Sequence, residues 1–206
     1  GTMGDHDFEF DSGHLALDFA NTKDWHASQT PQEKLNSYAD LVAWGQQAGL
    51  VSTEAAARLR LFALEQPRDS LNTYQFAIQL REALYHIFSN QYANLPLAPS
   101  DLATLNSVVQ QAMAHLRLTP VNGVMQWEWD TSLESANLIL WPVARAAAEL
   151  LTSPRASLVR ECEDDRGCGF LFMDQSKNHS RRWCSMESCG NRAKARRHYA
   201  KTQSSE

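Results

Sequence analysis

The spacing of apolar and polar positions changes several times along the chain. Residues 8–11 alternate apolar and acidic side chains, and residues 15–19 resume in the same way after Gly13, which predicts paired strands near the start. From residue 31 onward, apolar side chains recur every three or four positions, which is typical of helices with one buried face. The helices predicted in this way cover residues 31–48, 52–64, 71–92, 100–116 and 133–151.

Three residues define the limits or the shape of these helices. Ser52 is a good N-cap for the second helix, and Pro67 is expected to end it, because proline disfavours helical geometry in the residue before it. Pro142 lies inside the last predicted helix and is expected to kink it.

A different pattern follows the fourth helix. Asn122 and Gly123 separate two alternating segments at residues 116–118 and 124–129. Because this dipeptide adopts the positive φ angles of a type I′ turn, it predicts a β-hairpin. The fold class expected is therefore α+β, with a mainly helical N-terminal domain that carries a small antiparallel sheet.

The distribution of charge suggests two parts. The chain of 206 residues has a net charge of −5, but residues 1–154 hold 8 basic against 17 acidic side chains, whereas residues 155–201 hold 11 against 6. The breaker Thr152-Ser153-Pro154 lies where the sign changes. We therefore predict an acidic domain over residues 1–154 and a basic module over residues 155–206.

Composition narrows the class of protein. Hydrophobic residues make up 43% of the chain, as in globular proteins, and no run approaches the roughly 18 apolar residues of a membrane span. The acidic start is unlike a secretory leader, so the expected location is cytoplasmic. Residues 1–154 contain no phosphate-binding glycine loop, cysteine nucleophile or close histidine pair, and we expect no enzymatic activity.

The four cysteines all lie in the basic module. Cys162 and Cys168 are separated by five residues, Cys184 and Cys189 by four, and fifteen residues lie between the two pairs. Two such pairs can converge on one tetrahedral zinc ion, and four thiolates would close its coordination sphere, so the ion would be structural. Buried free thiols or disulfides are the alternatives, and disulfides are disfavoured in a reducing compartment.

The residues around the cysteines predict a scaffold for the ion. Residues 170–173 and 181–183 are expected to form a hairpin that brings the two cysteine pairs together. Gly190 allows a tight backbone beside the metal, Asn191 is a good helix cap, and residues 192–201 form helix readily. The order of pair, hairpin, pair and helix resembles a treble-clef or zinc-ribbon-like finger.

The same residues resemble a known family. The strings that carry the likeness are Cys168-Gly169-Phe170-Leu171-Phe172, Asp174, Ser176, Asn178, Ser180-Arg181-Arg182-Trp183-Cys184-Ser185-Met186 and Cys189-Gly190-Asn191-Arg192-Ala193-Lys194. They look like the CGNR zinc-finger family, whose members carry an N-terminal ABATE domain. The string Leu17-Asp18-Phe19-Ala20-Asn21-Thr22 resembles the opening motif of that domain. The resemblance implies that the four cysteines bind metal, that the finger binds DNA, and that the protein is a stress-induced transcription regulator.

The terminal basic residues suit a nucleic acid partner. Arginine pairs with phosphate and with guanine through a bidentate fork, and positive charge attracts duplex DNA. Since neighbouring strand residues point to opposite faces, only one of the first two basic residues is expected to face DNA. The predicted DNA-binding residues are Arg181, Arg182, Arg192, Lys194, Arg196, Arg197 and Lys201.

Other interpretations of this surface remain open. The arginines could neutralise the negatively charged zinc–thiolate centre, or the basic helix could simply be solvated. The finger could also act as a zinc-dependent protein-interaction adaptor without reading DNA. Because one small finger makes few contacts, a homodimer is expected for binding an operator.

Several polar and aromatic residues have a structural and a functional interpretation. Trp183 is expected to close a small apolar centre with Phe170 or Phe172 rather than to stack on a base. His179 is expected in a turn, and His198 on the surface.

In the N-terminal domain, two groups of side chains could line a pocket for a small-molecule effector. We favour structural roles for both: turn caps and backbone partners for Asp18 and Asn21, and packing in the core or at interfaces for the tryptophans. The polar group is Asp18, Asn21, Asp24 and His26, and the tryptophans are Trp44, Trp127, Trp129 and Trp141.

Overall fold

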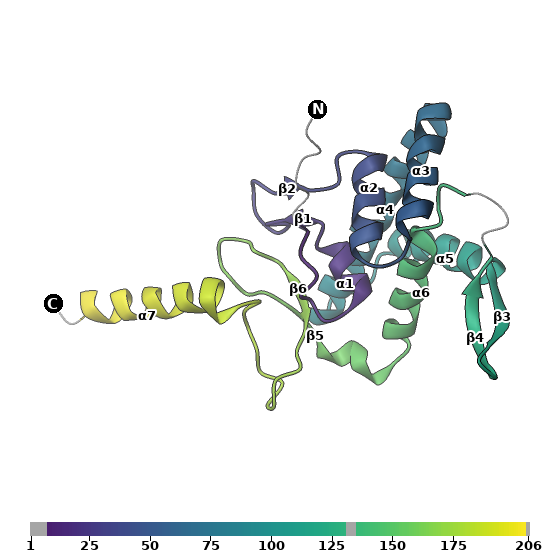
Figure 1. Ribbon diagram of the computed structural model, residues 1–206. Coiled ribbons are helices and arrows are strands. Elements are labelled where there is room, and N and C mark those ends of the chain that lie inside the picture. Colours follow the sequence, from purple (N-terminus) through teal and green to yellow (C-terminus); the bar gives the residue numbers. More distant parts are fainter. Residues whose placement is uncertain (1–7, 131–134, 205–206) are drawn as a thin grey trace.

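The computed structural model describes residues 8–130 and 135–204, and most of the chain folds as a bundle of helices (Figure 1). The longest helix packs against most of the others and forms the centre of the bundle. The helices of the bundle are α1 (Leu15–Ala20), α2 (Tyr38–Gln47), α3 (Thr53–Glu65), α4 (Pro67–Tyr92), α5 (Pro99–Ala114) and α6 (Leu140–Leu151). No helix in the described part of the chain is long and apolar enough to span a membrane.

The expected strand at residues 15–19 is wrong, because this segment forms the short helix α1. Five consecutive residues of α1, from Ala16 to Ala20, are buried. Burial along this segment therefore does not alternate as it would in a half-exposed strand. Periodicity cannot distinguish a buried helical turn from a buried strand in so short an apolar run. Residues 8–11 form no strand either, although the Ser12 carbonyl accepts a hydrogen bond from the Met173 amide.

The helices of residues 31–114 form largely where the sequence predicts them. Ser52 caps α3 as expected, and α4 begins at Pro67, where proline needs no amide hydrogen. The helix predicted from residue 31 begins only at Tyr38, because Ser37 is its cap and the preceding residues form a small ribbon. That ribbon pairs β1 (Lys23–Asp24) with β2 (Gln32–Glu33).

The last helix of the bundle starts later than predicted. Residues 131–134, which include the predicted start at residue 133, lie outside the described residues, and α6 begins at Leu140. Pro142 therefore lies in the first turn of α6 and not in its middle. Amide hydrogens in the first turn have no partner within the helix, so the predicted kink at this proline is wrong.

The predicted hairpin is confirmed. Strands β3 (Leu116–Val121) and β4 (Val124–Trp129) pair in register, and both turn residues have positive φ, 51° at Asn122 and 79° at Gly123. The register places Leu118, Met125 and Trp127 on one face of the hairpin, where each side chain is more than half exposed. At the base of the same face, Trp129 packs on Trp141 in the core.

The C-terminal part of the chain is built on the bundle. After a short 3-10 helix, η1 (Pro154–Leu158), strand β5 (Val159–Glu161) pairs antiparallel with β6 (Leu171–Met173), and this sheet packs against α1 and α4. The predicted partner of β6, residues 181–183, forms no strand. Strand β5 takes that position because Val159 adds to the core that Leu171 and Met173 share with the helices.

Two further helical segments complete the chain. A turn of π-helix, η2 (Met186–Gly190), leads directly into α7 (Asn191–Gln203), which projects away from the bundle (Figure 1). The predicted cap is wrong in detail, since Gly190 occupies the cap position and Asn191 is the first helical residue. The architecture agrees with the expected fold class: a helical domain with small antiparallel sheets, followed by a cysteine-rich finger and a helix.

Candidate metal centre

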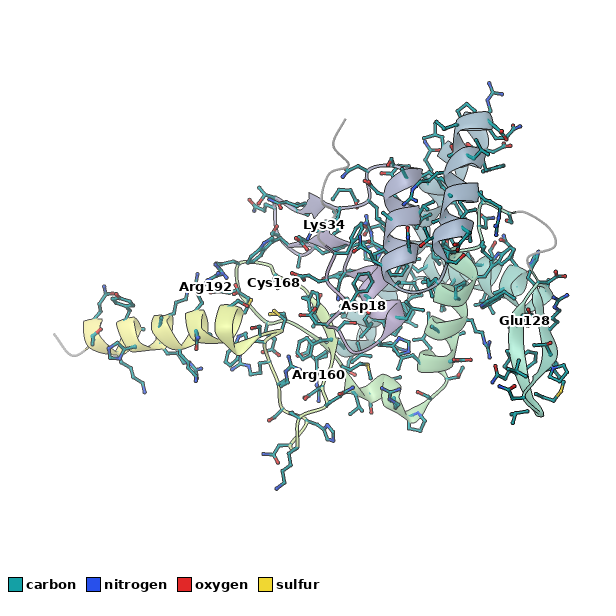
Figure 2. All side chains as sticks on the ribbon, viewed as in Figure 1. Asp18, Lys34, Glu128, Arg160, Cys168 and Arg192 are labelled. Carbon is teal, nitrogen blue, oxygen red and sulfur yellow. The ribbon has the colours of Figure 1, made fainter. Side chains whose placement is uncertain are left out.

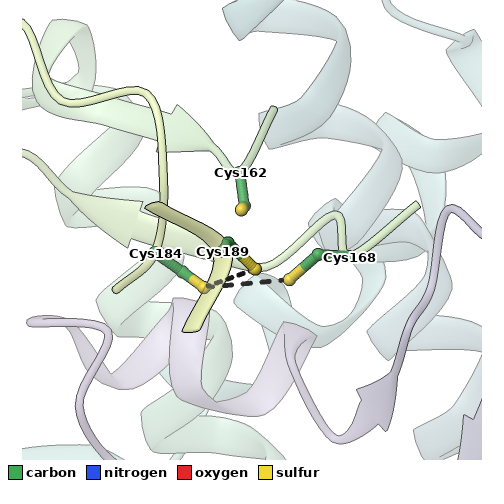
Figure 3. A group of neighbouring side chains, drawn as sticks. All are labelled: Cys162, Cys168, Cys184 and Cys189. Carbon is green, nitrogen blue, oxygen red and sulfur yellow. Dashed lines mark hydrogen bonds between the residues drawn. The ribbon is translucent and has the colours of Figure 1, made fainter. Parts of the chain in front are cut away.

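The structure brings all four cysteines together (Figure 3). Cys162 follows β5, Cys168 precedes β6, Cys184 lies in the loop before η2, and Cys189 lies within η2. Their sulfur atoms all lie within 4.8 Å of one another. The Sγ atom of Cys184 lies 3.8 Å from that of Cys168 and 3.7 Å from that of Cys189.

These distances fit a tetrahedral ion. A zinc–sulfur bond of about 2.3 Å with tetrahedral angles places neighbouring sulfurs about 3.8 Å apart. Both sulfur–sulfur distances agree with that value, and four thiols are the donor set that structural zinc prefers. The centre can therefore hold one zinc ion through Cys162, Cys168, Cys184 and Cys189, and no ligand position would remain open for catalysis.

A small apolar cluster surrounds the sulfurs. Cys162, Cys189 and Phe172 are its buried members, and Phe170 and Trp183 pack against them. This confirms the expectation that Trp183 closes the centre of the finger. The cluster is too small to stabilise the finger alone, so bound metal would contribute much of the local folding free energy.

Comparison with known families agrees with this geometry. A profile of the CGNR zinc finger matches residues 159–202, and a profile of ABATE, described as "Putative stress-induced transcription regulator", matches residues 13–154. The chain belongs to the ABATE family and ends in a CGNR zinc finger. Among curated proteins, no sequence matches the chain.

One face of α4 in the ABATE domain holds the first half of the finger. Tyr85, Ser89 and Tyr92 follow each other at helical spacing, and their hydroxyls reach the residues on either side of Cys162. Tyr85 and Ser89 contact a carboxylate oxygen of Glu161 at 2.7 and 3.0 Å, and Tyr92 donates to Glu163 at 2.6 Å. Local spacing in the sequence carries no signal for this contact, because each partner lies more than 70 residues away.

Tyr85 also contacts the residue that follows the second cysteine. Its hydroxyl lies 2.7 Å from the carbonyl of Gly169, the residue after Cys168. Burial and the nearby Glu161 carboxylate raise the pKa of Tyr85 far above its ordinary value, so the hydroxyl remains a donor. Gly169 has a φ of +66°, and a β-carbon there would lie 2.5 Å from the Tyr85 oxygen, so the close contact requires glycine.

The polar residues singled out near the start of the ABATE domain have structural partners. The Asn21 side chain donates to the Leu171 carbonyl at 2.8 Å and accepts from the Leu171 amide at 2.9 Å. Asp18 accepts from the amide and hydroxyl of Ser12, and His26 contacts Glu82 at 2.7 Å. The structural interpretation is thus confirmed for Asp18 and Asn21, which satisfy backbone and side-chain donors.

The four tryptophans considered for a pocket differ in their burial. Trp44 and Trp141 are fully buried in the core, and Trp129 packs at its edge. Trp127 is 54% exposed on the hairpin, where the Arg145 guanidinium lies 5.4 Å from its ring. Core packing is therefore confirmed for Trp44, Trp129 and Trp141, whereas Trp127 lies on the surface, where a role at an interface stays a prediction.

An acidic turn, residues 163–165, lies between Cys162 and Cys168 and faces the basic residues of the finger. The Arg166 guanidinium donates two hydrogen bonds to Asp164 and lowers the pKa of that carboxyl to about 2. Arg192, at the start of α7, lies 4.0 Å from the same carboxylate. Because Asp164 stays charged, the base of α7 is held beside the acidic turn.

The other two acids of this turn also pair with predicted DNA-binding residues. Arg196 forms an ion pair with Asp165, and Arg182 donates to Glu163 at 2.6 Å. Hydrogen bonds from Tyr92 and Arg182 lower the pKa of Glu163. Three of the seven predicted residues, Arg182, Arg192 and Arg196, therefore already have acidic partners in the finger.

Arg181 occupies a different environment. Its side chain donates to the Cys184 carbonyl at 2.7 Å, and its guanidinium lies 4.4 Å from the centre of the Phe172 ring. It therefore braces the loop that carries Cys184. The argument from opposite strand faces does not apply to Arg181 and Arg182, because residues 181–183 are not a strand.

The remaining predicted residues lie on the outer side of α7. With 3.6 residues per turn, Lys194, Arg197, His198 and Lys201 share one face, opposite Arg192 and Arg196. All four are exposed, as expected for His198. We call Lys194, Arg197, His198 and Lys201 the outer face of α7. His179 lies in a turn with a φ of 47°, which also agrees with expectation.

Proposed function

We propose that the protein is a DNA-binding transcription regulator whose outer face of α7 contacts duplex DNA. The observation that carries this proposal is the shape and charge of that helix. None of its described residues is buried, and side chains project from it into solvent (Figure 2). The α7 helix is about 20 Å long, and an α-helix is narrow enough to lie in the major groove of DNA, which is about 12 Å wide.

Two chemical features support a polyanionic partner for this face. Lys194, Arg197 and Lys201 are cationic, and no acidic residue lies on α7. Arg197 also rests over the Trp183 ring, 5.6 Å from its centre, which links the outer face to the apolar cluster around the cysteines. The metal centre would thus set the angle at which α7 meets DNA.

The acidic turn makes the two sides of α7 different. Phosphate would have to approach Arg192 and Arg196 past Asp164 and Asp165, whose negative charges repel it. We therefore expect Arg192 and Arg196 to position α7 and the outer face to supply most of the phosphate contacts.

Paired variants test this proposal. We expect Lys194→Ala with Arg197→Ala to weaken binding of zinc-loaded protein to duplex DNA by at least about tenfold and to lower the salt slope by about two. The matched control, Arg192→Ala with Arg196→Ala, removes the same charge from the side of the acidic turn and should change the salt slope less. Gel retardation over a range of salt concentrations, with zinc content measured for each variant, gives the comparison.

Two results would contradict the assignment. Salt-independent or absent retardation of duplex DNA by the zinc-loaded protein would show that DNA is not the partner. Equal losses of affinity and salt slope in both paired variants would show that the two sides of α7 contribute equally to DNA binding.

The exposed hairpin favours a second candidate function, a protein-interaction adaptor whose contact surface lies in the ABATE domain. Leu118, Met125 and Trp127 form an exposed apolar face, and such faces are typical of protein contacts. Copurification of a stable protein partner that survives Lys194→Ala with Arg197→Ala, but is lost on Trp127→Ser, would favour the adaptor.

The broader role is part of the same proposal. The family description supports regulation under stress, and DNA binding by a single short helix supports a homodimer that spans two half-sites. Sedimentation analysis with and without DNA would measure the dimer. We propose that the ABATE domain carries out no catalytic step and is the part that would receive a small-molecule effector. We also propose a cytoplasmic location.

A further inference from the structure

The metal centre is reached from solvent through a cleft. The cleft has a volume of about 330 Å³ and lies between the start of the ABATE domain, near Asp11 and Trp25, and the finger. Cys168, Cys184 and Cys189 line it, whereas Cys162 does not. Cys168 and Cys184 are also the two cysteines that are only partly buried. Two of the four sulfur ligands are therefore accessible to a small neutral molecule.

The two accessible cysteines are close enough to react with one another. Their sulfur atoms are 3.8 Å apart, and a disulfide bond is about 2.05 Å long, so the sulfurs need to approach by less than about 2 Å. The segment that carries Cys184, residues 181–185, has no strand pairing. It is held by the bond from the Glu163 amide to the Arg182 carbonyl and by the Arg181 side chain, which donates to the Cys184 carbonyl. No strand pairing has to break for Cys184 to approach Cys168, which precedes the paired strand β6 and whose neighbour Gly169 is held by Tyr85.

We infer that the zinc centre is also a reversible oxidation site, at which a neutral hydroperoxide converts Cys168 and Cys184 into a disulfide and the metal is released. The inference depends on the metal centre and not on DNA binding.

The reaction is balanced with hydrogen peroxide as the oxidant. The Cys184 thiolate attacks one peroxide oxygen, which forms a sulfenic acid and releases hydroxide as the O–O bond breaks. The Cys168 thiolate then attacks the Cys184 sulfur, and the second hydroxide leaves as the S–S bond forms. The two sulfurs lose two electrons in total, peroxide gains them, and two protons from solvent convert the hydroxides to water.

Loss of two ligands has a predictable structural consequence. Cys162 and Cys189 alone cannot complete a tetrahedral shell, so the ion dissociates. Cys189 leads within two residues into α7, which packs mainly on η2. Oxidation would therefore loosen the basic helix while the β5–β6 sheet stays on the ABATE domain.

The test uses the full zinc-loaded chain and hydrogen peroxide. We expect release of about one zinc ion per chain, followed with a colour-forming chelator, together with a Cys168–Cys184 cross-link found by peptide mass mapping. A thiol reductant with added zinc should restore the metal. Zinc loss at the same rate without peroxide, a cross-link through Cys162, or irreversible oxidation without any cross-link would each overturn the inference.

Two variants separate access from chemistry. Ser188 is exposed and lines the cleft, and Ser188→Trp should fill it and slow zinc release on the order of tenfold, because exchange and oxidation rates depend on access to the sulfur. Cys184→His keeps a fourth zinc ligand but cannot form the disulfide, so it should retain zinc under peroxide. If Cys184→His does not bind zinc, the test is the rate of zinc release under peroxide from Ser188→Trp and from the unmodified chain. Equal rates would show that peroxide does not reach the sulfurs through the cleft.

Discussion

Asn21 joins two parts of the chain that lie 150 residues apart. Its side chain satisfies both the amide and the carbonyl of Leu171 in β6, and it is 8% exposed. A buried donor and acceptor left without a partner each cost about 1–3 kcal/mol. Asn21 is thus a main tether between the ABATE domain and the finger.

We predict that Asn21→Ala lowers the free energy of unfolding by about 3 kcal/mol, because it leaves both backbone groups of Leu171 without their partner. The control is Asn36→Ala, which removes an exposed side-chain bond to the Glu33 carbonyl and should cost less than about 1 kcal/mol. Urea unfolding of the zinc-loaded variants measures both. Equal effects would show that Asn21 is not a tether.

Glu82 should make stability depend on pH. Burial opposes its ionisation, but the hydrogen bond from His26 and the charges of Arg81 and Lys23 outweigh it and lower the pKa of Glu82 to about 2. Because the pKa in the folded state is below the ordinary value of 4.5, charged Glu82 stabilises the protein above that pH, and this contribution is lost as the pH falls from about 4.5 to about 2.

Glu82→Gln tests this dependence. We expect the variant to be less stable than the unmodified chain at pH 7, and the difference should shrink at pH 3, where the unmodified Glu82 has begun to lose its contribution. Urea unfolding of metal-free protein at both pH values keeps zinc release out of the comparison. Glu54→Gln, at an exposed position on α3, is the control for loss of one negative charge. A difference in stability that is the same at both pH values would argue against stabilisation by the ion pairs of Glu82 with Arg81 and Lys23.

At the scale of elements, the β3–β4 hairpin shows how one face can serve two purposes. Its base contributes Trp129 to the core, and its outer part exposes Trp127. Both side chains lie on the same face of the same strand, separated by one residue. Substituting each of them in turn therefore distinguishes a role in core packing from a role on the surface.

We predict that Trp129→Ala lowers the free energy of unfolding by roughly 2–3 kcal/mol, somewhat less than for a fully buried aromatic residue. Trp127→Ala should cost less than about 1 kcal/mol, mainly the contact with Arg145. Thermal or urea unfolding provides the measurement. A large loss for Trp127→Ala would mean that the exposed face packs against the protein's own surface in solution.

At the scale of the whole molecule, the finger has two halves with different supports. Val159, Leu171 and Met173 belong to the main hydrophobic core, and α4 side chains bond to the strand before Cys162. The second half, which includes η2 and α7, is held by the small cluster around the sulfurs, by ion pairs with the acidic turn and by backbone bonds of Arg181 and Arg182 to Asp174 and Glu163. The metal is therefore expected to matter most for the second half.

We predict that removing zinc with a chelator unfolds residues 181–203 and leaves the rest folded. Hydrogen exchange measured by mass spectrometry should show loss of protection in η2 and α7, with little change in β5, β6 and α4. Readdition of zinc should restore protection. Loss of protection throughout the chain would show that the ion stabilises the whole fold.

Much of this protein was predictable from local sequence. The cysteine spacing predicted one closed zinc site, Asn122-Gly123 predicted a hairpin, and repeated apolar positions predicted the helices from residue 52 to residue 116 within a few residues of their observed bounds. These features depend on backbone preferences and on ligand chemistry that act over short distances. The contact of the outer face of α7 with DNA and the domain boundary after residue 154 remain predictions.

Other features were decided only by tertiary packing. The apolar run of α1 is compatible with strand or helix until the bundle encloses it, and β6 pairs with β5 because Val159 adds to a shared core. Which arginines pair with residues 163–165, and which face solvent, depends on where zinc-ligand geometry places α7 relative to that turn. Contacts of this kind join residues far apart in the chain, and local spacing carries no signal for them.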